Sequence, residues 1–382
     1  MTDTPSLSPT GDPWLLTPGP LTTSPTVKAA MQHDFGSRDH NFIAINKRMR
    51  ERLADLVKGG EDYVCVPMQG SGTFAVEAML GTMVPRDGKV LVLVNGAYGE
   101  RIAKILDYHG RAKVVQKCPE NQPVNVSQLE GTLSADSAIT HVVAVHCETT
   151  TGILNPLKEI SEATARQGRK LLIDAMSAFG AVPLEATDVT FDAVAASSNK
   201  CIEGTPGMGF CIVRKDTLEA CAGNCPSLSL DLYDQWVAME KNAQWRFTPP
   251  VQVIAAFDQA LNEFEDEGGV AGRGARYAAN CKILLDGMAE LGFEALLPAE
   301  LQAPIIVTFL MPSHPRFDFN AFYDRLKDKG YVIYPGKLTV AETFRIGCIG
   351  RLGAKEMNGA LEAIKDTLAE MGVDNCAPAA AA

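Results

Sequence analysis

From about residue 60 onward, short apolar runs rich in β-branched residues alternate with amphipathic stretches of helical length. In chain order these runs are DYVCVP (62–67), KVLVLVNG (89–96), AKVVQK (112–117), THVVAVHCE (140–148), RKLLIDAMSA (169–178) and FDAVAASS (191–198). Strands that alternate with helices imply βαβ crossovers, whose strands lie parallel in one sheet. We therefore predict an α/β fold with a mainly parallel sheet flanked by helices.

The chain of 382 residues is long enough for a large domain and a smaller second one. Paired prolines in FTPPVQVIAAF (247–257) suggest a boundary, and the following pattern of helices and strands predicts a compact α+β unit. We predict a disordered lead-in at 1–13, a large domain at 14–255, a small C-terminal α+β domain at 256–374 and a disordered tail at 375–382.

Charge and cysteine usage narrow the function classes. The net charge of -11, without a Lys/Arg block, argues against a nucleic-acid partner, and no apolar run approaches the ~18 residues of a membrane span. The start MTDTPSLSPTGDPW lacks the features of a secretory signal, so we expect a cytoplasmic protein.

The ten cysteines lack the spacing of a zinc site, with Cys221 and Cys225 the nearest approach, so we expect free thiols and no metal.

Polar segments follow the predicted strands directly. They are NGAYG (95–99), HCETTTG (146–152), DAMSAFG (174–180) and SSNK (197–200). In open α/β sheets, ligands bind at the carboxyl ends of the strands. A further segment, QGSGTFAVEA (69–78), is a glycine turn that opens a helix, so its N–H groups could hold a phosphate, although such a turn is often only a tight turn.

Taken together, these groups match the needs of one cofactor, pyridoxal 5'-phosphate. Lys200 supplies an amine that burial can free of its proton, and Asp174 supplies a carboxylate that keeps a ring nitrogen protonated. Tyr98 offers an aromatic face, the glycine turn offers phosphate donors, and Arg345 offers a fixed cation. The run GTPGMGF (204–210) after Lys200 predicts a turn that reverses the chain.

Each residue alone also has an ordinary structural explanation. Lys200 could be a solvated surface charge and Asp174 a helix cap or turn residue. Tyr98 could be a half-buried core aromatic, and Arg345 a strand residue that extends its charge to the surface. Their joint occurrence at successive strand ends favours the cofactor site over these alternatives.

Longer strings around these motifs resemble a known family. They are LLTPGPLTTS (15–24), QGSGTFAVEA (69–78), NGAYGERIAKI (95–105), CETTTGILNP (147–156), IDAMSAFG (173–180), SNKCIEGTPGMGF (198–210), SLSLDLYDQW (227–236), RFTPPVQV (246–253) and FRIGCIG (344–350). Together they are similar to the 2-aminoethylphosphonate–pyruvate aminotransferases, pyridoxal-phosphate enzymes of fold type I. The resemblance runs over nearly the whole chain, from about residue 14 to about residue 372.

The resemblance implies a role for each matching residue. Lys200 would be the Schiff-base lysine, and Asp174 would pair with the ring nitrogen of the cofactor. These two are the implied catalytic residues. The other implied cofactor contacts are Ser71, Gly72, Thr73 and Asn199 at the phosphate, Thr248 reaching the phosphate from a second subunit, Tyr98 and Met176 on the two ring faces, and Thr149 by the phenolic oxygen.

The resemblance also implies an activity and an assembly. The enzyme would be a homodimer with active sites at the interface, converting 2-aminoethylphosphonate and pyruvate to phosphonoacetaldehyde and L-alanine by ping-pong chemistry in phosphonate degradation. Arg345 would bind the acidic group of the substrate. Arg38, in FGSRDHNF, stands where the family often has an aromatic residue, and it either grips a substrate acid or pairs with Asp39 on the surface.

Other functions fit parts of the same pattern. The nearest is an alanine–glyoxylate or serine–pyruvate type aminotransferase on the same scaffold, against which SLSLDLYDQW (227–236) argues. A desulfurase would need a mobile catalytic cysteine, whereas Cys201 directly follows the lysine, in a position suited to packing. A nucleotide-binding module would use the glycine turn alone and would form no Schiff base.

Overall fold

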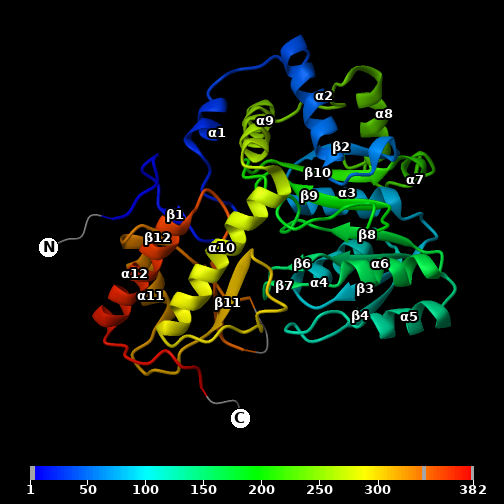
Figure 1. Cartoon of the computed structure of the whole chain (residues 1–382). Helices are drawn as coiled ribbons and strands as arrows, with labels where there is room; N and C mark the ends of the chain where they lie inside the picture. The colour runs from blue at the N-terminus through cyan, green and yellow to red at the C-terminus, as the bar shows by residue number, and fades with distance from the viewer. Residues whose placement is uncertain (1–4, 338–340, 380–382) are drawn as a thin grey trace.

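A seven-stranded sheet forms the centre of the larger part of the molecule in the computed structural model, which describes residues 5–337 and 341–379 (Figure 1). In spatial order its strands are β2 (Tyr63–Gln69), β10 (Met208–Arg214), β9 (Ala193–Ser197), β8 (Lys170–Asp174), β5 (Ile139–Val145), β3 (Lys89–Val94) and β4 (Ala112–Lys117). Strand β10 runs antiparallel to both of its neighbours, and the other pairings are parallel. The predicted α/β fold with a mainly parallel sheet is confirmed.

Helices cover both faces of this sheet. One face packs against α1 (Pro25–Ala30), α2 (His40–Asp55), α5 (Val126–Ala135), α6 (Leu157–Arg166) and α9 (Val251–Asp266), and the other against α3 (Gly72–Met83), α4 (Ala97–Tyr108), α7 (Lys215–Glu219) and α8 (Leu232–Asn242). Along β3, Leu91 and Leu93 join the first core while Val90 and Val92 join the second. Because side chains alternate across a strand, a strand covered on both faces is apolar throughout.

A second, smaller unit lies beside the sheet, at the lower left in Figure 1. Its elements are the antiparallel strands β11 (Ile306–Leu310), β14 (Thr343–Gly347) and β13 (Tyr334–Pro335), and the helices α10 (Gly269–Glu290), α11 (Phe319–Asp328) and α12 (Ala354–Met371). Strand β1 (Trp14–Leu15) joins this unit by pairing in parallel with β12 (Tyr331–Val332). The short elements that remain are the 3-10 helix Gly60–Asp62 and the hairpin of β6 (Cys147–Glu148) and β7 (Ile153–Leu154).

The division of the chain at 255/256 stays a prediction. Phe257 and Phe264 of α9 pack in the core of the large sheet, whereas Leu284 and Met288 of α10 pack in the core of the small unit. The packing therefore favours a boundary between α9 and α10. It also assigns the segment around Trp14 to the small unit, although the prediction placed that segment in the large domain.

The chain ends were expected to be disordered, but their described parts have fixed partners. The N–H of Ser6 donates to the carbonyl of Lys329, and Leu7 pairs with Pro13. Near the other end, Cys376 is buried and the N–H of Ser313 donates to the carbonyl of Ala377. Backbone pairing with the small unit thus orders both segments. Residues 1–4 and 380–382 lie outside the described residues.

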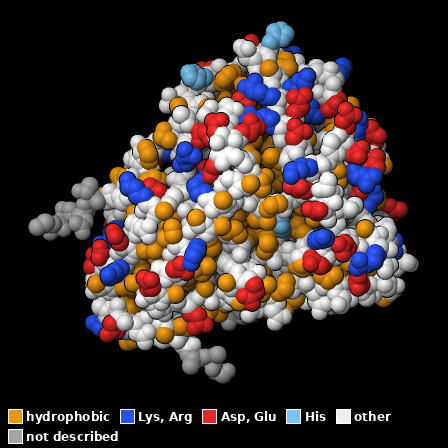
Figure 2. All heavy atoms as spheres, in the orientation of Figure 1, with side chains coloured by type: hydrophobic (Ala, Val, Ile, Leu, Met, Phe, Trp, Pro, Cys, Tyr) orange, Lys and Arg blue, Asp and Glu red, His pale blue; other side chains and the backbone are white. Residues whose placement is uncertain are grey.

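Acidic and basic side chains are interspersed over the face of the molecule shown in Figure 2, without a block of one sign. None of the helices in the described chain is long and apolar enough to cross a bilayer.

Buried charges fix the turn that follows β9. Glu203, at a φ of 62°, accepts hydrogen bonds from Arg276 (Nη2, 2.7 Å) and from the Tyr277 hydroxyl (2.6 Å), both on α10. Arg273, which is fully buried, donates to the carbonyl of Cys201 (2.5 Å) and to Glu267 (2.7 Å). The segment just after Lys200 is therefore joined by charged hydrogen bonds to the first helix of the small unit. The predicted chain reversal follows it, since β10 runs antiparallel to β9.

We expect Glu203→Ala to lower the free energy of unfolding by about 3 to 5 kcal/mol, because removing one partner of a buried ion pair leaves the other charge uncompensated. Urea denaturation of the two proteins measures the difference. The control is Glu185→Ala, which removes a surface ion pair with Lys58 (2.6 Å) and should cost less than about 1 kcal/mol. Equal losses in the two variants would contradict a stabilising role for the buried cluster.

Candidate active site

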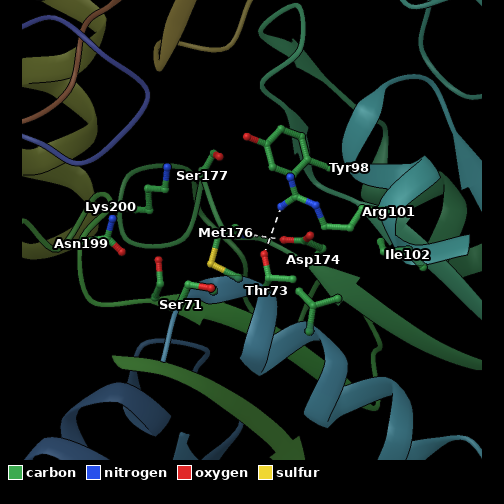
Figure 3. Close-up of a pocket in the computed structure, with 13 residues that line it drawn as sticks. Ser71, Thr73, Tyr98, Arg101, Ile102, Asp174, Met176, Ser177, Asn199 and Lys200 are labelled. Atoms are coloured by element: carbon green, nitrogen blue, oxygen red, sulfur yellow. Dashed lines mark hydrogen bonds between the residues drawn. The ribbon is translucent and has the colours of Figure 1, made fainter. Parts of the chain in front are cut away.

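A cavity of about 180 Å³ lies where the polar segments after the strands meet (Figure 3). Its lining comes from the start of α3, from α4, and from the segments after β8 and β9. Eight of the predicted site residues line it, namely Ser71, Gly72, Thr73, Tyr98, Asp174, Met176, Asn199 and Lys200. The structure thus brings together residues that the strand-end pattern placed at one edge of the sheet.

Lys200 extends its half-buried amine toward the N-terminal segment. Its Nζ donates to the carbonyl of Pro18 at 2.5 Å. The pKa of this amine is lowered from 10.5 to about 8, mainly by burial and in part by the nearby charge of Arg345, while Asp174 opposes the change. Gly19 has a φ of 120°, and a Cβ there would lie 2.6 Å from Nζ, so only glycine lets the chain pass this close to the amine.

Asp174 ends β8 at the cavity, with only 5% of its surface exposed. Its carboxylate accepts a hydrogen bond from the N–H of Met176 at 3.0 Å. Burial raises the pKa of this carboxyl from 3.8 to about 6, because the charged form loses its hydration. A cation placed against Asp174 in the cavity would stabilise the ionised form.

The start of α3 is arranged to hold an anion. Ser71 is its N-cap, and the N–H groups of Phe74 and Ala75 donate back to the carbonyl of Ser71. The N–H groups of Gly72 and Thr73 lie in the first turn of α3, where a helix offers free donors and a positive dipole end. A Cβ at Gly72 would lie 2.2 Å from the sulfur of Met176, so a larger residue there would displace the Met176 side chain.

Arg101 also lines the cavity, and the sequence analysis did not single it out. Its guanidinium lies 4.8 Å from the centre of the Tyr98 ring and donates to the hydroxyl of Thr73 at 3.1 Å (Figure 3). The sequence could have predicted this position, because residues three apart on a helix share a face and Arg101 lies three residues after Tyr98 on α4.

Arg345 and Thr149 lie next to each other, and neither is among the residues that line the cavity. Arg345, 3% exposed, donates to the carbonyls of Thr149 (2.8 Å) and Pro335 (3.0 Å), and its guanidinium lies 5.3 Å from the Tyr334 ring centre. Burial lowers the pKa of Arg345 from its usual value. The hydroxyl of Thr149 is buried and has no hydrogen-bond partner in the described chain.

Thr248 and Arg38 are exposed and lie apart from these residues. They line a different cavity of about 370 Å³, together with Arg246. The Asp39 carboxylate caps α2 by accepting from the N–H of Asn41 (2.8 Å), and no ion pair joins it to Arg38 in the described chain. A single chain therefore does not bring Thr248 or Arg38 to Lys200, and their proposed roles stay predictions.

Comparison with known proteins identifies the family. The family model "Aminotransferase class-V" matches residues 24–333. The chain belongs to this family. It is 54% identical to the 2-aminoethylphosphonate–pyruvate transaminase 2 of Burkholderia lata, over 97% of this chain and 98% of that one. It is 56% identical to the 2-aminoethylphosphonate–pyruvate transaminase of Rhizobium meliloti, over 97% of both chains.

Solved structures of other aminotransferases share the fold. Pyridoxamine–pyruvate aminotransferase from Mesorhizobium loti superposes with a TM-score of 0.86 at 23% identity, over 96% of this chain and 94% of that one. Alanine–glyoxylate aminotransferase from Nostoc sp. gives a TM-score of 0.86 at 22% identity, over 96% and 98%. The predicted fold type I is confirmed.

The class-V aminotransferase family uses pyridoxal phosphate, which is the cofactor of this chain, and the residues of the cavity fit it. The free N–H donors at the start of α3 suit its phosphate, and the buried Asp174 carboxylate suits a protonated ring nitrogen. The buried hydroxyls of Ser197 and Thr149 have no partner in the described chain and could donate to a bound group.

Cys201 does not have the properties of a catalytic thiol. It is fully buried, burial raises its pKa to about 12, and its thiol donates to the carbonyl of Ser177 at 3.1 Å. A buried, protonated thiol is a packing group. This agrees with its predicted structural role next to Lys200.

We expect the cofactor-free protein to bind pyridoxal phosphate faster as pH rises. Only the neutral Lys200 amine can attack the cofactor aldehyde, and a pKa of about 8 makes that form scarce below pH 8 and dominant above it. The uptake rate should therefore rise about tenfold between pH 7 and pH 9. Stopped-flow absorbance of the cofactor measures it. A rate that stays constant over this range would contradict the lowered pKa.

Proposed function

We propose that this chain is a 2-aminoethylphosphonate–pyruvate transaminase, which transfers the amino group of 2-aminoethylphosphonate to pyruvate and forms phosphonoacetaldehyde and L-alanine. The observation that carries the proposal is the convergence of Lys200, Asp174 and the start of α3 on one cavity beside a buried arginine, Arg345. Relatives at 54% and 56% identity over nearly the full length have this name.

We propose that Lys200 is the catalytic base. When bound, the cofactor condenses with an amine and withdraws electrons from the adjacent carbon. The lysine amine, with a pKa of about 8 and therefore mostly neutral above pH 8, would take the proton from the substrate carbon next to nitrogen and would carry it to the cofactor. Asp174 would keep the proton on the ring nitrogen, because a cation beside this buried carboxylate stabilises its ionised form.

The remaining predicted residues would hold the two ligands. Ser71, Gly72, Thr73 and Asn199 would bind the phosphate, Tyr98 and Met176 the ring faces, and Thr149 the phenolic oxygen. Arg345 would bind the acid group of each substrate in turn, because a guanidinium pairs bidentately with either a phosphonate or a carboxylate. Two such acids must use one pocket in a ping-pong reaction.

We further propose a homodimer in which Thr248 reaches the phosphate site of the partner subunit. The supporting observation is that Thr248 and Arg38 are exposed and line a surface cavity away from the Lys200 of their own chain. Large apolar side chains are exposed beside both candidate surfaces. Phe74, next to Thr73, is 50% exposed, and Phe247, next to Thr248, is 43% exposed. An interface would bury them. In this arrangement Arg38 lies near the mouth of the partner's site, where it could contact a substrate acid.

We also propose that the enzyme works in the cytoplasm. All ten of its cysteines are free, and most are buried. Free thiols are typical of a reducing compartment.

The first test is alanine production by cofactor-loaded protein. We expect alanine and phosphonoacetaldehyde from 2-aminoethylphosphonate plus pyruvate, and little product from serine plus pyruvate or from alanine plus glyoxylate. Lys200→Ala should lose at least about 10⁴-fold in kcat, since it removes both the covalent link to the cofactor and the base. Product analysis by chromatography measures both results.

The outcomes distinguish the candidates. Turnover with alanine and glyoxylate, but none with the phosphonate, would reassign the chain to the alanine–glyoxylate type and would leave the role of Lys200 intact. Wild-type activity in Lys200→Ala would contradict the mechanism.

Light scattering should give a particle mass of about two chains, because the exposed apolar residues need a partner surface. Thr248→Ala should weaken cofactor retention in dialysis about tenfold, which is the usual effect of losing a hydrogen bond to a charged group. A monomer with full activity would contradict the shared site.

A further inference from the structure

Glu148, in β6, is a buried carboxylate to which the proposed mechanism gives no role. None of its surface is exposed, and burial raises its pKa above the usual value. Its two oxygens accept hydrogen bonds from the N–H groups of Tyr98 (3.1 Å), Gly99 (3.4 Å) and Thr150 (3.1 Å), and from the hydroxyl of Thr150 (2.5 Å). A buried carboxyl with this many donors is held in one orientation.

Two of these donors, the N–H groups of Tyr98 and Gly99, lie in the first turn of α4 and have no partner within the helix. Its own N-cap, Gly96, has no side chain to accept them. Glu148 accepts from Tyr98 and Gly99 instead, and the hydroxyl of Thr150 accepts from the N–H of Ala97 at 3.0 Å. The hairpin of β6 and β7 thus caps α4 from another part of the chain.

Gly96 is needed because Glu148 fills the space where a side chain would lie. A Cβ at Gly96 would lie 2.4 Å from Cγ and Cδ of Glu148. The φ of Gly96 is 168°, an extended conformation open to other residues, so close packing alone explains the glycine. The strand and the helix start are therefore fitted to each other.

The same hairpin also contacts the substrate arginine. The carbonyl of Thr149 accepts from Nη1 of Arg345 (2.8 Å), and the carbonyl of Thr151 accepts from the hydroxyl of Thr308 (2.8 Å). Residues 148–151 therefore connect Tyr98, which lines the cofactor cavity, to Arg345, whose charge acts on Lys200.

We infer that Glu148 is a positioning residue that holds the Tyr98 ring and the Arg345 guanidinium at fixed places relative to each other. Glu148 itself is fully buried and is not among the residues that line the cavity. Its hydrogen bonds to the start of α4 fix Tyr98, and its place in the hairpin fixes the carbonyl that holds Arg345. The inference rests on the proposed function for the roles of those two residues.

The test is Glu148→Gln in the cofactor-loaded enzyme. The amide keeps the shape of the side chain, but its NH2 group faces N–H donors where an oxygen accepted before. We expect kcat/KM to fall about 10²-fold for 2-aminoethylphosphonate and for pyruvate, since a misplacement of about 1 Å costs that much. The circular dichroism of the bound cofactor, which reports the orientation of its ring, should change as well.

Two variants provide matched controls. Asn125→Ala removes the N-cap of α5, whose side chain accepts from Gln128, and should lower the melting temperature without changing KM or the dichroism. Arg345→Lys should raise KM for both substrates, because the fork geometry of the guanidinium is lost, and should leave the dichroism unchanged, because Arg345 is not among the residues that line the cofactor cavity. If Glu148→Gln does not fold, Thr150→Val removes the neighbouring hydroxyl and should cause a smaller change of the same kind.

A Glu148→Gln enzyme that is less stable, but has wild-type kcat/KM and dichroism, would overturn the inference and leave only a structural role. Failure of the proposed function would look different. In that case the wild-type enzyme makes no alanine from the phosphonate, while the dichroism still reports whether Glu148 orients the cofactor ring.

Discussion

The burial of Glu203 is the constraint on which the arrangement of this site depends. A buried carboxylate is costly unless it is paired, and here its partners all come from α10, the first helix of the small unit. The turn with Lys200 is therefore fixed to the small unit by directional charged bonds. Apolar contacts alone would allow sliding between the units, because they are not directional.

In the cavity, burial favours the neutral forms of Lys200 and Asp174. Burial lowers the pKa of Lys200 to about 8 and raises that of Asp174 to about 6. Both shifts have one cause, the loss of hydration, and both can be reversed by a ligand that brings charge of the opposite sign. A cofactor with a protonated ring nitrogen and an anionic phosphate brings both kinds of charge, so its binding and the charge state of the site are coupled.

The residues that sequence could predict are those whose signal is local. Asp174 ends an apolar strand and Lys200 closely follows another, and the N–H groups of the glycine turn at the start of α3 can hold a phosphate, so their meeting at one cavity follows from parallel strands. Glu148 gave no such signal, because its role depends on a helix start some fifty residues earlier in the chain. The places of Thr248 and Arg38 could not follow from one chain at all, since the proposal requires a second copy.

The N-terminal segment has a consequence for biosynthesis. Strand β1 pairs with β12, so Trp14 meets Tyr331, and the same segment continues to Pro18 and Gly19, which lie against Lys200. A ribosome releases the N-terminus first, but this segment finds its partner strand only when most of the chain has been made. The surroundings of Lys200 are therefore completed late, and a prematurely terminated chain cannot assemble them even though it contains the lysine itself.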